Sequence, residues 1–152
     1  MSLKSPSVSV AIIGAGVSGL TLARVLQKHG VSCTIFESEK SATSRDQGGS
    51  LDMHADTGTR ALEIAGLLDQ FYANARPEGD EMRFVGKRGN LEFVLSGQID
   101  LTNLSPDPKK WGRDIRPEID RGVLRQILLN SLEPGTIQWD TKLSAIEQAS
   151  EG

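Results

Sequence analysis

Three glycines near the N-terminus have the spacing of a phosphate-binding turn. Gly14, Gly16 and Gly19 follow an apolar, β-branched segment at residues 8–13 and give the pattern G-x-G-x-x-G. In this pattern the first glycine permits a tight turn, and the second lets a pyrophosphate approach the backbone. The third lets a helix pack closely against the preceding strand. The glycines alone are a weak signal, but a strand before them and a helix after them favour dinucleotide binding.

A carboxylate at the matching distance supports the same interpretation. Glu37 follows Gly19 by 18 residues, at the end of a second predicted strand. There it can accept hydrogen bonds from both hydroxyls of an adenosine ribose, and it would repel a 2′-phosphate, which disfavours NADP in this pocket. Val17 and Ser18 begin the helix, whose free N–H groups can hold phosphates without a lysine. The alternative is that the glycines only make a turn and Glu37 is a solvated strand end.

The elements that must position these residues form a β-α-β unit. Residues 8–13 and 34–36 are short apolar strands, and an apolar stripe at helical spacing predicts a helix over residues 17–29, ended by Gly30. Two parallel strands need such a crossover between them. We therefore expect an α/β, Rossmann-like FAD- or NAD(P)-binding fold with three layers, in which crossover helices cover a parallel sheet.

The rest of the chain departs from regular α/β alternation. The pattern predicts, in order, a loop at 38–47, a strand at 50–53, helices at 57–65 and 67–73 hinged at Gly66, an inserted hairpin of strands 82–85 and 91–95, a long surface connection at 96–118, a helix from Asp120 to Pro134, and strands at 137–139 and 143–146. These inserted elements favour FAD over NAD, because FAD is longer and needs additional contacts. No linker divides the chain, so we expect one domain over residues 1–152.

Composition argues against several other classes of function. The 152 residues carry 17 Lys and Arg against 20 Asp and Glu, a net charge of −3, which disfavours nucleic acid as a partner. Cys33 is the only cysteine and no apolar run is long enough to span a membrane, so we expect a cytoplasmic protein without disulfides or a membrane partner. His29 and His54 lie outside any cluster with metal-ligand spacing, so we expect no metal site.

Four segments together resemble the N-terminal part of class A FAD-dependent monooxygenases, the group of the aromatic hydroxylases. They are residues 11–26, Gly48-Gly49-Ser50-Leu51-Asp52-Met53-His54, Ala65-Gly66-Leu67-Leu68, and residues 117–132. They occur in the same order and at similar spacing over nearly the whole chain. Within that class, the sequence is most similar to the tetracycline-inactivating flavin monooxygenases.

The resemblance implies roles for individual residues. Glu37 matches the acid that binds the adenosine ribose of FAD, and Asp52, after Gly49 of the Gly-Gly pair, matches an aspartate that contacts FAD. Arg121 matches an arginine at the start of the later helix that also holds FAD. The alternatives are an ordinary exposed strand residue for Asp52 and a solvated first-turn residue for Arg121.

Two further positions concern the nicotinamide and the adenine. Arg45 lies where the most similar relatives have an arginine implicated in engaging NADPH, although a surface role in a polar loop is as good an interpretation. Ser38 departs from the pattern, since many relatives have arginine directly after the ribose-binding acid. A contact to the adenine side is therefore missing or replaced.

The resemblance also implies an activity. It is that of an NAD(P)H-dependent flavoprotein monooxygenase, with FAD as cofactor and NADPH as co-substrate, that uses O2 to hydroxylate an aromatic or polyketide-like small molecule. No catalytic side chain is expected from this segment. Members of the class are much longer, so we expect either a fragment or mispredicted gene product, or a truncated protein. The alternatives are another dinucleotide-dependent oxidoreductase, an NAD dehydrogenase or a non-hydroxylating flavoprotein, or a catalytically silent nucleotide-binding fragment.

Overall fold

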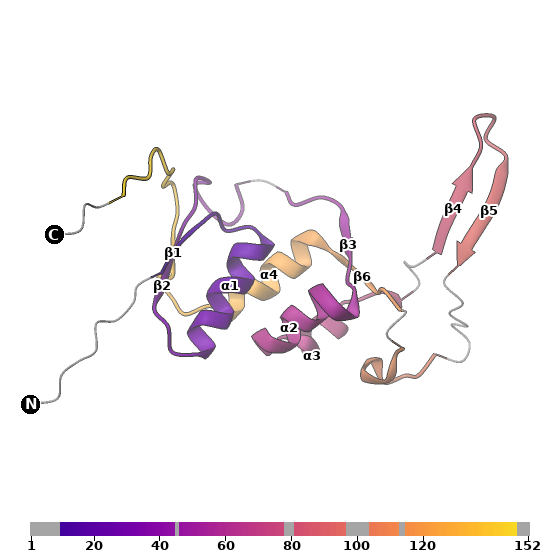
Figure 1. The fold of residues 1–152 in the computed structure, drawn as a ribbon, viewed down its shortest axis with the longest axis horizontal. Coiled ribbons are helices and arrows are strands. Elements are labelled where there is room, and N and C mark those ends of the chain that lie inside the picture. The colour runs from indigo at the N-terminus through magenta and orange to yellow at the C-terminus, as the bar shows by residue number, and fades with distance from the viewer. Residues whose placement is uncertain (1–9, 45, 78–80, 97–103, 113–114, 149–152) are drawn as a thin grey trace, which may run out of the picture. The chain divides into compact units, whose positions relative to one another are not determined.

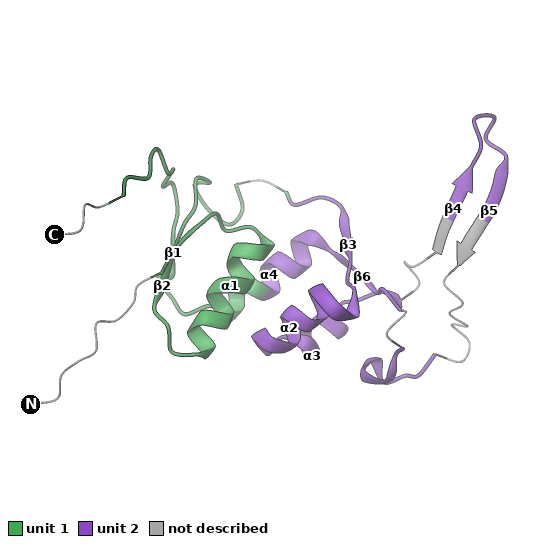
Figure 2. Cartoon of the chain, viewed as in Figure 1, with its two compact units in different colours: residues 1–46, 128–152 green, residues 47–127 purple. Residues whose placement is uncertain are grey.

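The computed structural model describes residues 10–44, 46–77, 81–96, 104–112 and 115–148. They form two compact units, one of residues 1–46 and 128–152 and the other of residues 47–127 (Figure 2). The boundary between the two units falls within helix α4 (Arg121–Ser131). Among the described residues, every helix is too short or too polar to cross a membrane.

The first unit is a β-α-β crossover with a third parallel strand. Helix α1 (Val17–Lys28) joins strand β1 (Val10–Ile13) to strand β2 (Cys33–Phe36), as Figure 1 shows. Strand β7 (Ile137–Gln138) pairs with the other edge of β2, and both pairings are parallel. The predicted α/β class, with a parallel sheet and a crossover helix, is confirmed.

Apolar side chains of α1 and the sheet make the core of this unit. Ile12 and Ile35 lie opposite each other in the register of β1 and β2, and both are buried. Leu20 and Ala23 are the buried residues of α1, which contacts both strands. Full burial of a side chain as large as Leu20 contributes about 1.5–3 kcal/mol. Gly30, at φ +71°, takes the left-handed conformation that follows the end of α1.

The second unit combines an antiparallel strand pair with short helices. Strand β3 (Ser50–Asp52) pairs with strand β6 (Glu118–Asp120). The helical segments between them are a π-helical turn η1 (Ala55–Thr59), helix α2 (Arg60–Ala65) and helix α3 (Leu68–Tyr72). Gly66 ends α2 at φ +73°, so the predicted hinge between two helices is confirmed.

The predicted hairpin also belongs to the second unit. Strand β4 (Glu81–Val85) pairs antiparallel with strand β5 (Leu91–Ser96), and Gly89 takes φ +78° in the connecting turn. The rings of Phe84 and Phe93 stack across the two strands with centroids 4.2 Å apart. A short 3-10 helix, η4 (Pro108–Lys110), lies in the connection that follows the hairpin.

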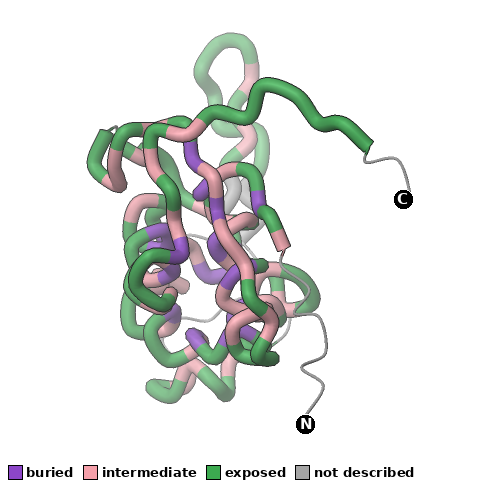
Figure 3. Tube along the Cα trace, turned by 90° about the vertical axis from the view of Figure 1, so that its left-hand side faces the viewer, coloured by how far each residue is buried: buried purple, intermediate pink, exposed green. Residues whose placement is uncertain are grey.

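Two sequence-based expectations about strands are wrong. Residues 143–146 form no strand: this segment is exposed (Figure 3), and Ile146 is 83% exposed. A segment with alternating polarity forms a strand only where a neighbouring strand satisfies its backbone N–H and C=O groups. None of the described residues pairs with this segment. Conversely, β6 lies where only a surface connection and a helix cap were expected.

Candidate functional site

The predicted phosphate-binding turn lies where β1 ends and α1 begins. Gly14 has φ +97°, which favours glycine, and its N–H donates to the carbonyl oxygen of Phe36 at 2.9 Å. A Cβ at Gly19 would lie against the carbonyl oxygen of Gly14, well inside contact distance. The chain's own geometry therefore accounts for two of the three glycines, one through its backbone angle and one through close packing.

Gly16 is required by neither of these two constraints. Its φ of −76° and ψ of 172° lie in the extended region that any residue adopts. A Cβ at this position would have no other described atom within 4 Å, beyond those of its own neighbours. Glycine is a favoured residue at a helix N-cap, which Gly16 is, and close approach by a ligand is a second reason for a glycine here, because the second glycine of this pattern is where a pyrophosphate meets the backbone. The turn therefore fits a dinucleotide diphosphate.

Helix α1 begins with N–H groups directed to the same turn. Gly16 is its N-cap and supplies no side-chain hydrogen bond, and the first turn contains no acidic residue. The N–H of Leu20 donates to the carbonyl oxygen of Gly16 at 3.0 Å, so the N–H groups of Val17 and Ser18 precede the helical hydrogen-bond ladder. The positive end of the helix dipole favours an anion at this position.

Glu37 lies at the end of β2, as predicted, but its carboxylate is already held by the protein. It is buried, at 8% exposure, and its Oε2 accepts a hydrogen bond from the N–H of Ala15 at 2.5 Å. Its Oε1 accepts from the N–H of Glu39 at 2.8 Å and from Ser38 Oγ at 3.1 Å. An ionised carboxylate offers about four acceptor positions, and these donors of the protein occupy most of them.

These hydrogen bonds keep Glu37 ionised. Burial is the largest single influence and raises the pKa of the Glu37 carboxyl. The hydrogen bonds from the N–H groups of Glu39 and Ala15 and from Ser38 together lower it by more, so the pKa of Glu37 lies below its usual value. Sequence reasoning missed the bond to Ala15, and it treated Ser38 only as a departure from a pattern. In the structure, Ser38 supports the carboxylate.

The second unit brings three other predicted residues onto one strand pair. The N–H of Arg121 donates to the carbonyl oxygen of Gly49 at 3.0 Å, and Gly49 has φ +81°. Asp52 lies opposite Glu118 in the register of β3 and β6, and its side chain is exposed. Arg121 is exposed, and among the described residues its guanidinium has no hydrogen-bond or ion-pair partner. Gly49, Asp52 and Arg121 therefore belong to one local structure.

Two other predictions concern Arg45 and metal ions. Arg45 lies outside the described residues. Within the described part of the chain, no group of three or more His, Cys, Asp or Glu side chains is arranged to hold a metal ion.

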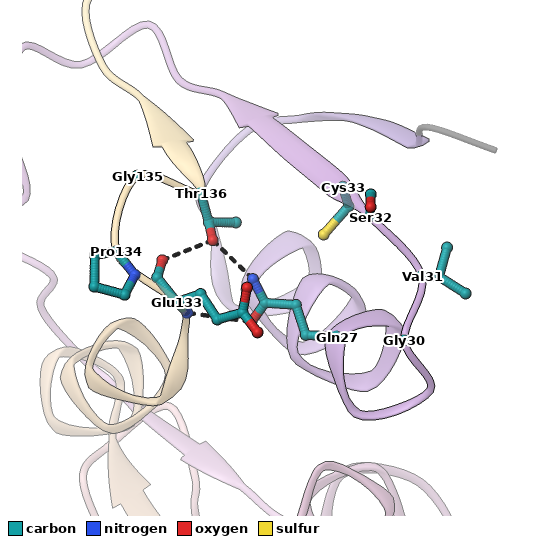
Figure 4. A pocket seen from close by; sticks show the side chains of 9 residues that line it. All are labelled: Gln27, Gly30, Val31, Ser32, Cys33, Glu133, Pro134, Gly135 and Thr136. Carbon is teal, nitrogen blue, oxygen red and sulfur yellow. Dashed lines mark hydrogen bonds between the residues drawn. The ribbon is translucent and has the colours of Figure 1, made fainter. Parts of the chain in front are cut away.

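A separate pocket of about 310 Å³ lies at the other end of the parallel sheet, away from the glycine turn, where strands β2 and β7 begin (Figure 4). Gln27 spans one wall: its Nε2 donates to Thr136 Oγ1 at 2.7 Å, and its Oε1 accepts from the N–H of Glu133 at 3.3 Å. Burial raises the pKa of the Cys33 thiol, and the charge of Glu133 raises it further. A thiol with a raised pKa is a poor nucleophile at neutral pH.

Comparison with known proteins identifies the family of this chain. The model of the FAD binding domain family matches residues 7–152. Monooxygenase asqM of Emericella nidulans is 33% identical over 153 residues, an alignment that covers 97% of this chain and 31% of that protein. This chain therefore spans about a third of the length of the curated relative it matches.

Solved structures show the same fold. A Photorhabdus luminescens protein named as a FAD-containing monooxygenase superimposes with a TM-score of 0.67 at 29% identity, over 94% of this chain and 33% of that one. Tetracycline destructase Tet(55) superimposes with a TM-score of 0.64 at 22% identity, over 96% of this chain and 33% of that one. The predicted Rossmann-like fold and the resemblance to FAD-dependent monooxygenases are confirmed.

Proposed function

Because this chain belongs to the FAD binding domain family, we propose that it binds FAD as the N-terminal portion of an NAD(P)H-dependent flavoprotein monooxygenase. The proposal treats residues 1–152 as part of one FAD-binding domain. The substrate class we propose is an aromatic or polyketide-like small molecule, and O2 is the second substrate.

The observation that carries the proposal is the geometry of Gly16. A glycine that neither backbone angle nor packing requires, placed between a strand and the first turn of a helix, supports a diphosphate resting against the main chain. In this proposal Gly14 and Gly19 shape the turn. The N–H groups of Val17 and Ser18 donate to the phosphate oxygens.

The other predicted residues bind the rest of the cofactor. Glu37, held ionised, accepts hydrogen bonds from the adenosine ribose. Gly49, Asp52 and Arg121 are also proposed to contact FAD. Arg45 engages NADPH, which is our proposed co-substrate.

FAD, when bound, supplies the redox chemistry, in which electrons from the nicotinamide and one atom of O2 serve to hydroxylate the substrate. The residues of this chain bind and orient the cofactor and provide its electrostatic surroundings. None of them is proposed to transfer a proton to or from the substrate.

Titration of the chain with FAD, FMN and NAD, followed by flavin or protein fluorescence, tests the proposal. We expect saturable binding of FAD, weaker binding of FMN because it lacks the adenosine, and loss of FAD binding in Gly16→Ala. Binding of NAD with none of FAD would overturn the flavoprotein assignment and leave an NAD-dependent oxidoreductase. Addition of NADH or NADPH to the FAD-bound chain without oxygen tests the co-substrate, and faster loss of flavin absorbance with NADPH is expected.

A further inference from the structure

Arg76 joins strand β6 through its main chain. Its N–H donates to the carbonyl oxygen of Glu118 at 2.8 Å, and the N–H of Glu118 donates to the carbonyl oxygen of Arg76 at 2.9 Å. The other edge of β6 pairs with β3, so Arg76 adds one residue of a third strand to this pair. Arg76 thus lies in the same local structure as the strand that leads directly into Arg121.

The side chain of Arg76 pairs with both acids of β6. Its guanidinium lies 2.7 Å from Asp120 Oδ1 and 3.6 Å from Glu118 Oε2. The hydrogen bond from Arg76 and the positive charge of its guanidinium lower the pKa of Asp120, so Asp120 stays ionised at neutral pH. The side chains of Arg76 and Asp120 are 40% and 54% exposed, and ion pairs at such exposure contribute little to stability. The stability of the unit is therefore a poor explanation for this arrangement.

The distribution of charge around Arg121 suggests another role. Two carboxylates of β6, Glu118 and Asp120, lie just before Arg121 in the sequence. Asp52 of β3 lies opposite Glu118 in the pairing of β3 with β6. Asp120 is the immediate neighbour of Arg121, yet it pairs with Arg76, and the guanidinium of Arg121 has no partner among the described residues.

We propose that Arg76 is a positioning residue that occupies Asp120 and Glu118 and so leaves Arg121 available to an oxygen-rich or anionic ligand. The inference rests on the proposed function, in which Arg121 contacts FAD. Without Arg76, Asp120 is the nearest carboxylate in sequence to Arg121 and is free to pair with it. A paired Arg121 must give up that partner before it can bind a ligand, which weakens binding.

The test is a set of variants in which Arg76 is removed alone or together with the carboxylate of Asp120. In Arg76→Ala we expect the Kd for FAD to rise about tenfold, toward that of Arg121→Ala. In Arg76→Ala/Asp120→Asn we expect most of the lost affinity to return, because the competing carboxylate is gone. Asp120→Asn alone and Arg76→Lys should bind FAD nearly as the wild type does. Arg60→Ala is the matched control, since Arg60 is an exposed arginine of the same unit that pairs with Glu63.

A merely structural role for Arg76 would give a different pattern. Loss of affinity in Arg76→Ala that Asp120→Asn does not restore would overturn the inference. So would unchanged affinity in Arg76→Ala. Far-ultraviolet circular dichroism and urea unfolding of each variant identify any loss of fold, and if Arg76→Ala does not fold, Arg76→Gln replaces it in the same comparison.

Chemical labelling separates this inference from the proposed function. Phenylglyoxal modifies unpaired arginines, and mass spectrometry gives the rate at Arg121 without FAD. We expect Arg121 to react more slowly in Arg76→Ala than in the wild type, by about twofold or more, and to recover in Arg76→Ala/Asp120→Asn. If labelling follows this pattern while the wild type binds no FAD, the proposed function fails and the charge pairing stands. Equal labelling of Arg121 in all three proteins would overturn the inference whatever the result with FAD.

Discussion

The N–H of Ala15 donates a hydrogen bond to Oε2 of Glu37 at 2.5 Å, from within the glycine turn to the end of β2. Together with the bond from Gly14 N–H to Phe36, it fixes the turn against the neighbouring strand. Glu37 thus has a structural role in shaping the turn in addition to the ribose contact that we propose. The two roles lead to separate predictions.

Glu37→Gln should weaken both the fold and FAD binding. The substitution replaces one acceptor oxygen by an amide NH2, which cannot accept from the N–H of Ala15 or Glu39. We expect the free energy of unfolding to fall by about 1–3 kcal/mol, because a buried donor loses its partner. We expect the Kd for FAD to rise about tenfold or more. Urea denaturation and fluorescence titration measure the two effects. Glu133→Gln, an exposed acid in the same unit, is the control and should change neither quantity.

The depressed pKa of Glu37 predicts a loss of stability in acid. Because the folded state binds the proton less readily than the unfolded state does, ionised Glu37 stabilises the fold at pH values above its unfolded pKa of about 4.3. That contribution decreases as the pH falls below this value and through the lower pKa of the folded state. The difference in unfolding free energy between the wild type and Glu37→Gln, measured from neutral to acid pH, should therefore shrink with falling pH. A difference that grows in acid would contradict the lowered pKa of Glu37 in the folded state.

Gly16→Ala and Gly19→Ala should separate ligand binding from folding. At Gly16 the backbone suits any residue and a Cβ has space, so we expect only the modest cost of changing a helix N-cap, about 0.5–1 kcal/mol, together with loss of FAD binding. At Gly19 a Cβ meets the Gly14 carbonyl oxygen, so we expect about 1–3 kcal/mol of destabilisation. Gly112→Ala, at another open position, is the control for both measurements. Normal FAD binding by Gly16→Ala would remove the main support for the diphosphate site.

Cys33 should react slowly with thiol reagents. Its raised pKa, caused first by burial and then by the charge of Glu133, leaves little thiolate at neutral pH. Glu133→Gln removes the second of these causes, so it should speed the reaction with 5,5′-dithiobis(2-nitrobenzoate) while leaving it slower than in the denatured protein, because burial still raises the pKa of the thiol. Denatured protein supplies the reference rate. Reaction of the folded wild type at the rate of the denatured protein would contradict the raised pKa of this half-buried thiol.

Local patterns explain why the first β-α-β unit could be predicted from the sequence. Its strands, its helix and its glycine turn each depend on neighbouring residues, and the turn required only the properties of glycine at Gly14 and Gly19. The contacts of Glu37 could not be predicted in the same way. They depend on the direction of one side chain and on how closely the turn approaches β2.

Strand β6 and the segment at residues 143–146 show the converse problem. β6 is only three residues long and has no alternation that marks it as a strand. It forms because residues 50–52, far away in the sequence, pair with it. Residues 143–146 have a strand-like pattern but no partner among the described residues, and they remain exposed. Strand formation depends on distant partners that a local pattern does not specify.

The most direct test of the central claim is an amide nuclear magnetic resonance spectrum of the isotope-labelled chain during titration with FAD. We expect the N–H signals of Gly16, Val17 and Ser18 to shift together and to saturate at the same FAD concentration. The matching signals should stay in place when FAD is added to Gly16→Ala. Binding of FAD that leaves these three signals unmoved and shifts others would contradict a diphosphate site at this turn.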